Sequence, residues 1–163
     1  MAGGKSIKQR KGQIKEISSN LEHREQQVSE LEGKYERAMD ARMSLENIEG
    51  LDDEAREHFR ELSAKELELL HEEGKELSDE MMDETHKLEE VRQENVEAMS
   101  ANQEAKGYAQ AFDKETGGDT VSTIDQQADS ISKVTDEINE AQKKIDDLSN
   151  RARNLSKRGG GSF

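Results

Sequence analysis

The sequence predicts an all-α fold, an elongated antiparallel coiled-coil bundle of three long helices. Apolar residues recur at alternating spacings of four and three along three segments of the 163-residue chain, which contains no proline. A spacing that averages 3.5 residues keeps one narrow stripe of a helix facing a partner helix, as in coiled coils. Two short glycine-containing stretches separate the segments, and short connections make neighbouring helices antiparallel.

The composition supports thin helix–helix seams. Hydrophobic residues make up 30% of the chain, aromatic residues 3% and charged residues 38%. Such a chain fills narrow seams between helices but does not fill a thick core. The absence of cysteine excludes disulfides, zinc–thiolate sites and thiol nucleophiles.

The first segment predicts a helix over residues 6–48. Its stripe consists of Ile7, Ile14, Ile17, Leu21, Val28, Leu31, Tyr35, Ala38 and Leu45, with Arg24 and Arg42 as polar interruptions. Gly50 is suited to end this helix, and Asp52 or Asp53 to cap the next one.

The second segment predicts a helix over residues 53–113. Its second half carries the 4-3 series Leu77, Met81, Glu84, Leu88, Val91, Asn95, Ala98, Asn102, Ala105, Ala109 and Phe112. Its first half carries Ala55, Phe59, Leu62 and Leu69 or Leu70, which do not fall cleanly in phase with that series. Gly74 lies at the mismatch, so a kink or a break there is the alternative to a continuous helix; an isolated glycine costs only about 1 kcal/mol against alanine.

The polar residues on the second stripe have two interpretations. Asn95, Asn102 and Glu84 are either buried and specify the register, or they face solvent because the bundle has ended there. The sequence alone leaves both open.

The third segment, residues 120–157, follows the loop Thr116–Asp119. Its stripe consists of Val121, Ile124, Ala128, Ile131, Val134, Ile138, Ala141, Ile145, Leu148, Ala152 and Leu155. We expect residues 1–158 to form a single helical domain and residues 159–163 to be a flexible tail.

The net charge of −14 is concentrated in the middle of the chain. Residues 46–97 contain 20 acidic and 6 basic residues, whereas the rest of the chain is balanced. This acidic body disfavours nucleic acid as a partner, because phosphates are repelled by it.

Two histidine motifs raise the alternative of a di-metal carboxylate enzyme. Glu68 and His71 have the E-x-x-H spacing of di-iron bundles, and Asp83 and His86 offer D-x-x-H. Such spacings arise readily by chance in an acidic segment, and a thin bundle has few pockets that shift pKa values. We therefore expect no metal, no cofactor and no catalysis.

The function that these features favour is a non-catalytic protein–protein interaction module, such as an adaptor, an assembly component or a targeting partner. A structural scaffold or filament is the alternative. The second helix is longer than its neighbours, so part of its stripe is expected to stay uncovered and to bind another protein, a basic one being favoured; homo-oligomerisation stays open. The predicted binding residues are Leu77, Met81, Leu88, Val91, Asn95, Ala98, Asn102, Ala105 and Phe112.

The sequence also predicts where the protein resides. No apolar stretch approaches the roughly 18 residues that a membrane span needs. The N-terminus lacks the apolar region of a signal peptide. We expect a cytoplasmic protein, or one exported without a cleaved signal peptide.

The organisation resembles small helical hairpin proteins associated with type VII secretion and LXG-type toxins. The shared features are an acidic, cysteine-free chain and the glycine-bearing turn of residues 48–51 between two long helices. The chain departs from that pattern in its missing W-x-G motif and in its third helix. It lacks the Y-x-x-x-D/E tail as well, because Tyr108 and Asp113 are one residue too far apart. The resemblance implies a toxin partner or a targeting factor.

Overall fold

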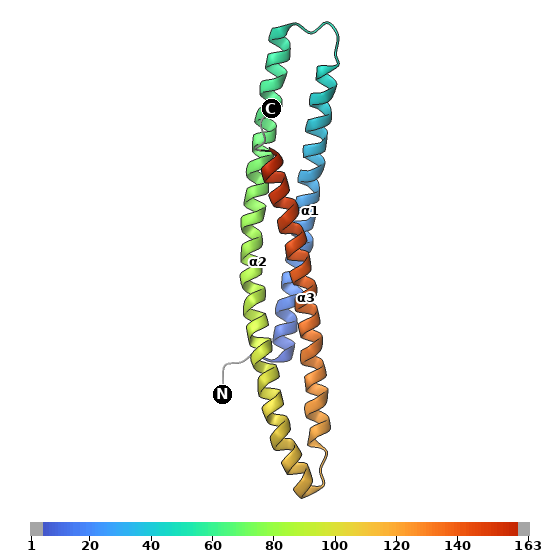
Figure 1. Cartoon of the computed structure of the whole chain (residues 1–163), viewed down its shortest axis with the longest axis vertical. Coiled ribbons are helices and arrows are strands. Elements are labelled where there is room, and N and C mark those ends of the chain that lie inside the picture. The colour runs from blue at the N-terminus through green and yellow to red at the C-terminus, as the bar shows by residue number, and fades with distance from the viewer. Residues whose placement is uncertain (1–4, 160–163) are drawn as a thin grey trace. The chain divides into compact units, whose positions relative to one another are not determined.

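The computed structural model describes residues 5–159 and contains, within that range, three α-helices and no strand (Figure 1). Helix α1 spans Ile7–Glu46, α2 spans Asp53–Thr116 and α3 spans Thr120–Gly159. The predicted fold class, three long helices packed together, is confirmed. Gly159 belongs to α3, whereas the rest of the predicted tail lies outside the described residues.

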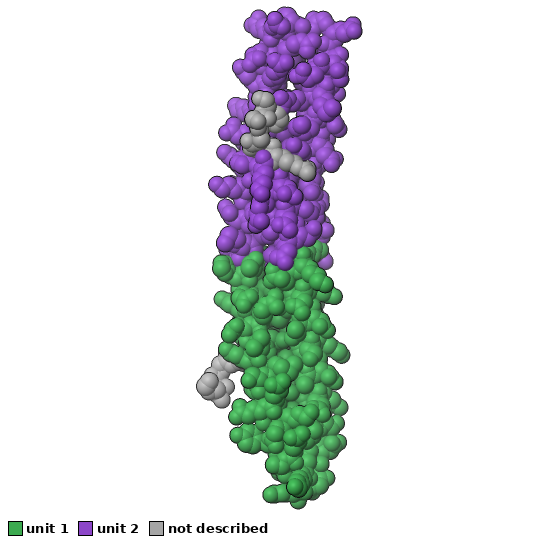
Figure 2. Space-filling model, viewed as in Figure 1, with its two compact units in different colours: residues 1–20, 84–144 green, residues 21–83, 145–163 purple. Residues whose placement is uncertain are grey.

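The chain divides into two compact units, and each unit contains a part of every helix (Figure 2). Unit 1 comprises residues 1–20 and 84–144, and unit 2 comprises residues 21–83 and 145–163.

Contacts within unit 1 show how its helices run. Arg10 of α1 bonds Asn95 of α2, and Asn20 of α1 bonds Glu84 of α2. Residues further along α1 therefore pair with residues earlier in α2. The same relation holds between α2 and α3, where Asn95 bonds the Ile131 carbonyl and Asn102 bonds the Ile124 carbonyl. Helix α2 is therefore antiparallel to both neighbours in this unit.

The α2–α3 connection of unit 1 is held by a side chain from the last turns of α2. Asp113 accepts hydrogen bonds from the backbone N–H groups of Thr120 and Val121, both at 2.9 Å, and from the Thr120 hydroxyl at 2.6 Å. These bonds satisfy N–H groups that the first turn of α3 leaves without helical partners. They also lower the pKa of the Asp113 carboxyl, the Thr120 hydroxyl contributing most. Gly117 ends α2 with φ of 71°, and its N–H donates to the Asp113 carbonyl.

Unit 2 brings α2 and α3 close together at Gly74. A Cβ atom at this position would lie 3.0 Å from the Ala152 carbonyl oxygen and 3.1 Å from the Ser156 nitrogen. Helix α2 continues through Gly74, so the alternative of a break in the helix is wrong. The glycine allows the backbones of two helices to approach closely.

The continuous helix also explains the phase mismatch in the sequence. Leu67, Leu70 and Gly74 are buried and continue the Leu77 series at the same 4-3 spacing. The out-of-phase residues Phe59, Leu62 and Leu69 therefore belong to a second face of α2, and all three are exposed.

Candidate interaction surfaces

The residues predicted to bind a partner lie mostly in the interior. Of that set, Leu77, Met81, Leu88, Val91, Asn95 and Asn102 are buried, Ala98 and Ala105 are half-buried, and Phe112 is 55% exposed. The expectation that this stripe is uncovered is wrong except at Phe112. The physical reason is that α2 packs against both of its neighbours, so this stripe forms the seam inside each unit.

The polar residues of that stripe form a buried cluster in unit 1. The Asn95 side-chain oxygen accepts a bond from Arg10 Nε at 3.1 Å, and its amide donates to the Ile131 carbonyl and to Thr135 Oγ1. Burial lowers the pKa of Arg10, which is 3% exposed, whereas nearby Glu94 favours its charged form. The solvent-facing interpretation of Asn95 is therefore wrong, and the cluster links all three helices in one register.

Asn102 and Glu84, the other polar residues of the stripe, are also buried. The Asn102 amide donates to the Ile124 carbonyl at 3.2 Å, while Glu84 lies near Asn20 and Lys87. Buried polar groups with few suitable partners disfavour shifted alignments of the helices, because a shift would leave them without hydrogen bonds.

The two histidine motifs do not come together. They lie 15 residues apart on the continuous helix α2, which corresponds to about 22 Å. His71 contacts the Ser156 carbonyl of α3 through Nδ1. In the part of the chain that the structure describes, no group of three or more histidine or acidic side chains is placed to hold a metal ion.

The α1–α2 hairpin of unit 2 has a different character. Between residues 32 and 66 no residue is buried, although the segment contains two long helical stretches. Nine large apolar side chains are exposed among the described residues, and five of them lie between residues 43 and 69. These five are Met43, Ile48, Phe59, Leu62 and Leu69. Exposed apolar side chains that gather in one region are typical of interaction sites.

Three of these side chains share one face of α2 with a row of carboxylates. We call this face the outer stripe; it consists of Phe59, Leu62, Glu66, Leu69, Glu73, Glu76 and Glu80. Their spacings are alternately three and four, so they line up along one side of the helix. All three apolar residues of the outer stripe lie toward the α1–α2 turn, with Glu66 among them, and the part toward the middle of α2 is wholly acidic. Sequence reasoning missed it, although the phase mismatch near Gly74 was its signal.

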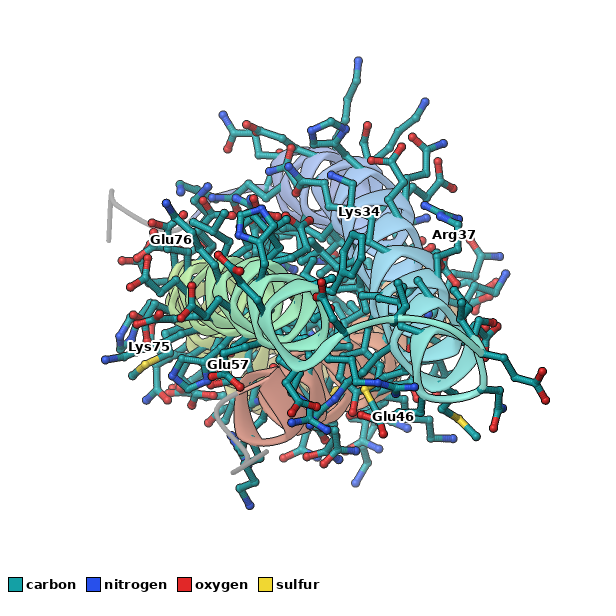
Figure 3. The ribbon with its side chains drawn as sticks, turned by 90° about the horizontal axis from the view of Figure 1, so that it is seen from above. Lys34, Arg37, Glu46, Glu57, Lys75 and Glu76 are labelled. Carbon is teal, nitrogen blue, oxygen red and sulfur yellow. The ribbon has the colours of Figure 1, made fainter. Side chains whose placement is uncertain are left out.

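The acidic half of the outer stripe borders a groove between α1 and α2 in unit 2. Its lining residues are Gln27, Glu30, Leu31, Lys34, Glu73, Glu76, Leu77 and Glu80. Leu31 and Leu77 are buried at its base, and four carboxylates face a single lysine along its walls. Figure 3 shows Lys34 and Glu76 on the side of the hairpin away from α3, whereas Glu46 and Glu57 lie toward α3. The groove is therefore open on the face that α3 does not cover.

Comparison of the chain with protein-family models, with curated proteins and with solved structures finds no match. The resemblance to type VII secretion hairpins therefore stays a prediction. None of the helices within residues 5–159 combines the length and apolar character that crossing a membrane requires.

Proposed function

We propose that this protein is a non-catalytic helical interaction module that binds a partner protein through the α1–α2 hairpin of unit 2. The observation that carries the proposal is the gathering of exposed large apolar side chains between residues 43 and 69. Elsewhere in the described residues most of the apolar stripe residues are buried within the chain, and the other exposed large apolar side chains are spread over residues 82–112.

The energetic argument rests on the contrast between these side chains and the seam. Removing apolar surface from water is favourable by roughly 25 cal/mol per Å². The seam residues, such as Leu88 and Leu148, already have this stabilisation within the chain because they are fully buried. Leu62 and Leu69 are exposed and lack this stabilisation, so a partner that buries them would gain it on binding.

A capture experiment tests the proposal. The full chain is immobilised and exposed to extract from its source cells, and the retained proteins are identified by mass spectrometry. The test variant combines Leu62→Asp with Leu69→Asp, and the matched control is Val96→Asp, which alters an exposed apolar residue of unit 1. We expect a protein that the wild-type chain and the control retain and that the test variant loses, with equal helicity in all three.

Two outcomes contradict the proposal. Retention of the same proteins by the test variant would show that the hairpin is not the binding surface. A concentration-dependent polymer in sedimentation would favour the structural scaffold instead.

A further inference from the structure

We propose that the outer stripe and the groove beside it bind one amphipathic helix of a partner protein, apolar toward one end and rich in lysine or arginine toward the other. This inference rests on the proposed function and adds the chemistry of the partner.

The first argument is the order of side chains along the outer stripe. Phe59, Leu62 and Leu69 are 36%, 53% and 49% exposed, with Glu66 between the two leucines. The carboxylates Glu73, Glu76 and Glu80 follow them without a further apolar residue on the same face. Because the spacing is that of a coiled-coil stripe, the matching ligand is another helix with apolar residues at intervals of three and four. The stripe from Phe59 to Glu80 measures about 31 Å along the helix, which a helix of about 21 residues matches.

The second argument is charge. The α2 portion of unit 2, residues 53–83, contains twelve acidic and four basic residues. The groove itself holds Glu30, Glu73, Glu76 and Glu80 against Lys34. Complementary charge steers association and rejects partners of the same sign, so this half of the surface fits a basic helix and repels a second copy of the same stripe.

The third argument concerns which carboxylates are available. Arg24 of α1 already pairs with Glu80. Glu73 and Glu76 are exposed at the groove mouth, and neither forms an ion pair with a cation among residues 5–159. They are therefore the two residues of the outer stripe that we expect to contribute most to binding a cationic helix.

Helix α3 provides continuity with an interface that already exists in unit 2. It covers the other side of the hairpin, where Gly74 meets Ala152 and Ser156 and where Arg151 bonds Glu32. A ligand helix in the groove would complete a four-helix arrangement in which Leu31 and Leu77 separate α3 from the ligand.

The test uses a designed peptide as the probe. This fluorescent 21-residue peptide carries leucine at 4-3 spacing in one half and lysine at the same spacing in the other, and a scrambled peptide of equal composition is the reference. Binding to the full chain is followed by fluorescence anisotropy. We expect the wild-type chain to bind the ordered peptide at least tenfold more tightly than the scrambled one.

Two charge-reversal variants make the test specific. Glu73→Lys with Glu76→Lys alters the outer stripe, and Glu68→Lys with Glu72→Lys makes the same charge change at exposed positions elsewhere on α2. We expect the first pair to weaken ordered-peptide binding at least tenfold and the second pair to weaken it by less than threefold. Circular dichroism checks that both variants keep their helicity.

Several results would overturn the inference. Equal loss in both charge variants would mean that net charge alone attracts the peptide, and no loss in the first would exclude the groove. Self-association abolished by Leu62→Asp would identify a second copy as the occupant. A further outcome is that the peptide fails to bind while the capture experiment still shows a protein that the wild-type chain retains and the variant with Leu62→Asp and Leu69→Asp loses. In that case the hairpin is a binding surface, and only the inference that its ligand is a basic helix is wrong. If both fail, the proposed function is wrong as well.

Discussion

The two hairpin ends of the chain differ in how far they bury their side chains. Residues 99–130 form the α2–α3 end of unit 1, and residues 32–66 form most of the α1–α2 end of unit 2. Among the described residues, most of each end consists of two helices without a third beside them (Figure 1). At the start of the α1–α2 end, α3 still reaches α1, where Arg151 bonds Glu32. The α2–α3 end still buries Asn102 and Ala109, whereas the α1–α2 end buries nothing between residues 32 and 66.

Side-chain size accounts for this difference. The α2–α3 end buries the smaller residues Asn102 and Ala109 in its seam and half-buries Val121 and Ile124, and Asn102 bonds the Ile124 carbonyl across the seam. Small residues let two helices cover their own seam. The α1–α2 end carries large apolar residues such as Met43 and Leu62, which two helices alone leave exposed. The α2–α3 end exposes Tyr108 and Phe112 as well, so the α1–α2 end is distinguished by exposed large apolar side chains together with the absence of any buried residue between residues 32 and 66.

The largest expected effect contrasts a seam residue with an outer-stripe residue. Ile131→Ala removes a fully buried side chain from the seam of unit 1, so we expect a loss of about 2–5 kcal/mol in the free energy of unfolding. Leu62→Ala should change it by no more than about 0.5 kcal/mol, because this side chain is exposed. Urea unfolding measures both values. A loss above about 2 kcal/mol for Leu62→Ala would show that the outer stripe is packed within the chain.

A smaller effect is expected where α2 and α3 approach in unit 2. Gly74→Ala places a methyl group against two backbone atoms of α3, and such overpacking costs about 1–3 kcal/mol. The matched control is Gly107→Ala, where nothing lies within 4 Å of the new Cβ and the helix gains up to about 1 kcal/mol. Thermal melting should therefore shift in opposite directions. A higher Tm for Gly74→Ala would contradict the close approach.

The smallest effect concerns the α2–α3 turn and its pH dependence. Because hydrogen bonds lower the pKa of Asp113 below its ordinary 3.8, the charged carboxylate stabilises the folded chain above that value. This contribution is lost as the pH falls through the lowered pKa. We expect Asp113→Asn to lower Tm at pH 7 and to reduce the loss of stability on acidification below about pH 3.8. An unchanged acid profile would show that the turn does not depend on this carboxylate.

Much of the fold follows directly from the sequence, because the 4-3 stripe and the glycine turns are local signals. Gly50 and Gly117 both have positive φ, as residues that end helices often do. The role of Gly74 could not be predicted in the same way, because its reason lies in the backbone of α3, which is distant in sequence. The candidate surface could not be predicted for a related reason. The sequence shows that Phe59, Leu62 and Leu69 are out of phase with the Leu77 series, but which of the two stripes is buried depends on packing against α1 and α3.

The central claim is that the α2–α3 end has buried residues whereas the α1–α2 end has none between residues 32 and 66. Residue-resolved hydrogen exchange on the free chain tests this claim most directly. Amides in segments with few buried contacts exchange through local opening at a lower free energy. We predict clearly faster exchange within residues 32–46 and 53–66 than within residues 99–116 and 120–130 at the same pH. Equal protection of the two hairpin ends would contradict the account. It would mean that the α1–α2 end also has buried, packed residues and that its apolar side chains are not exposed for a partner to bind.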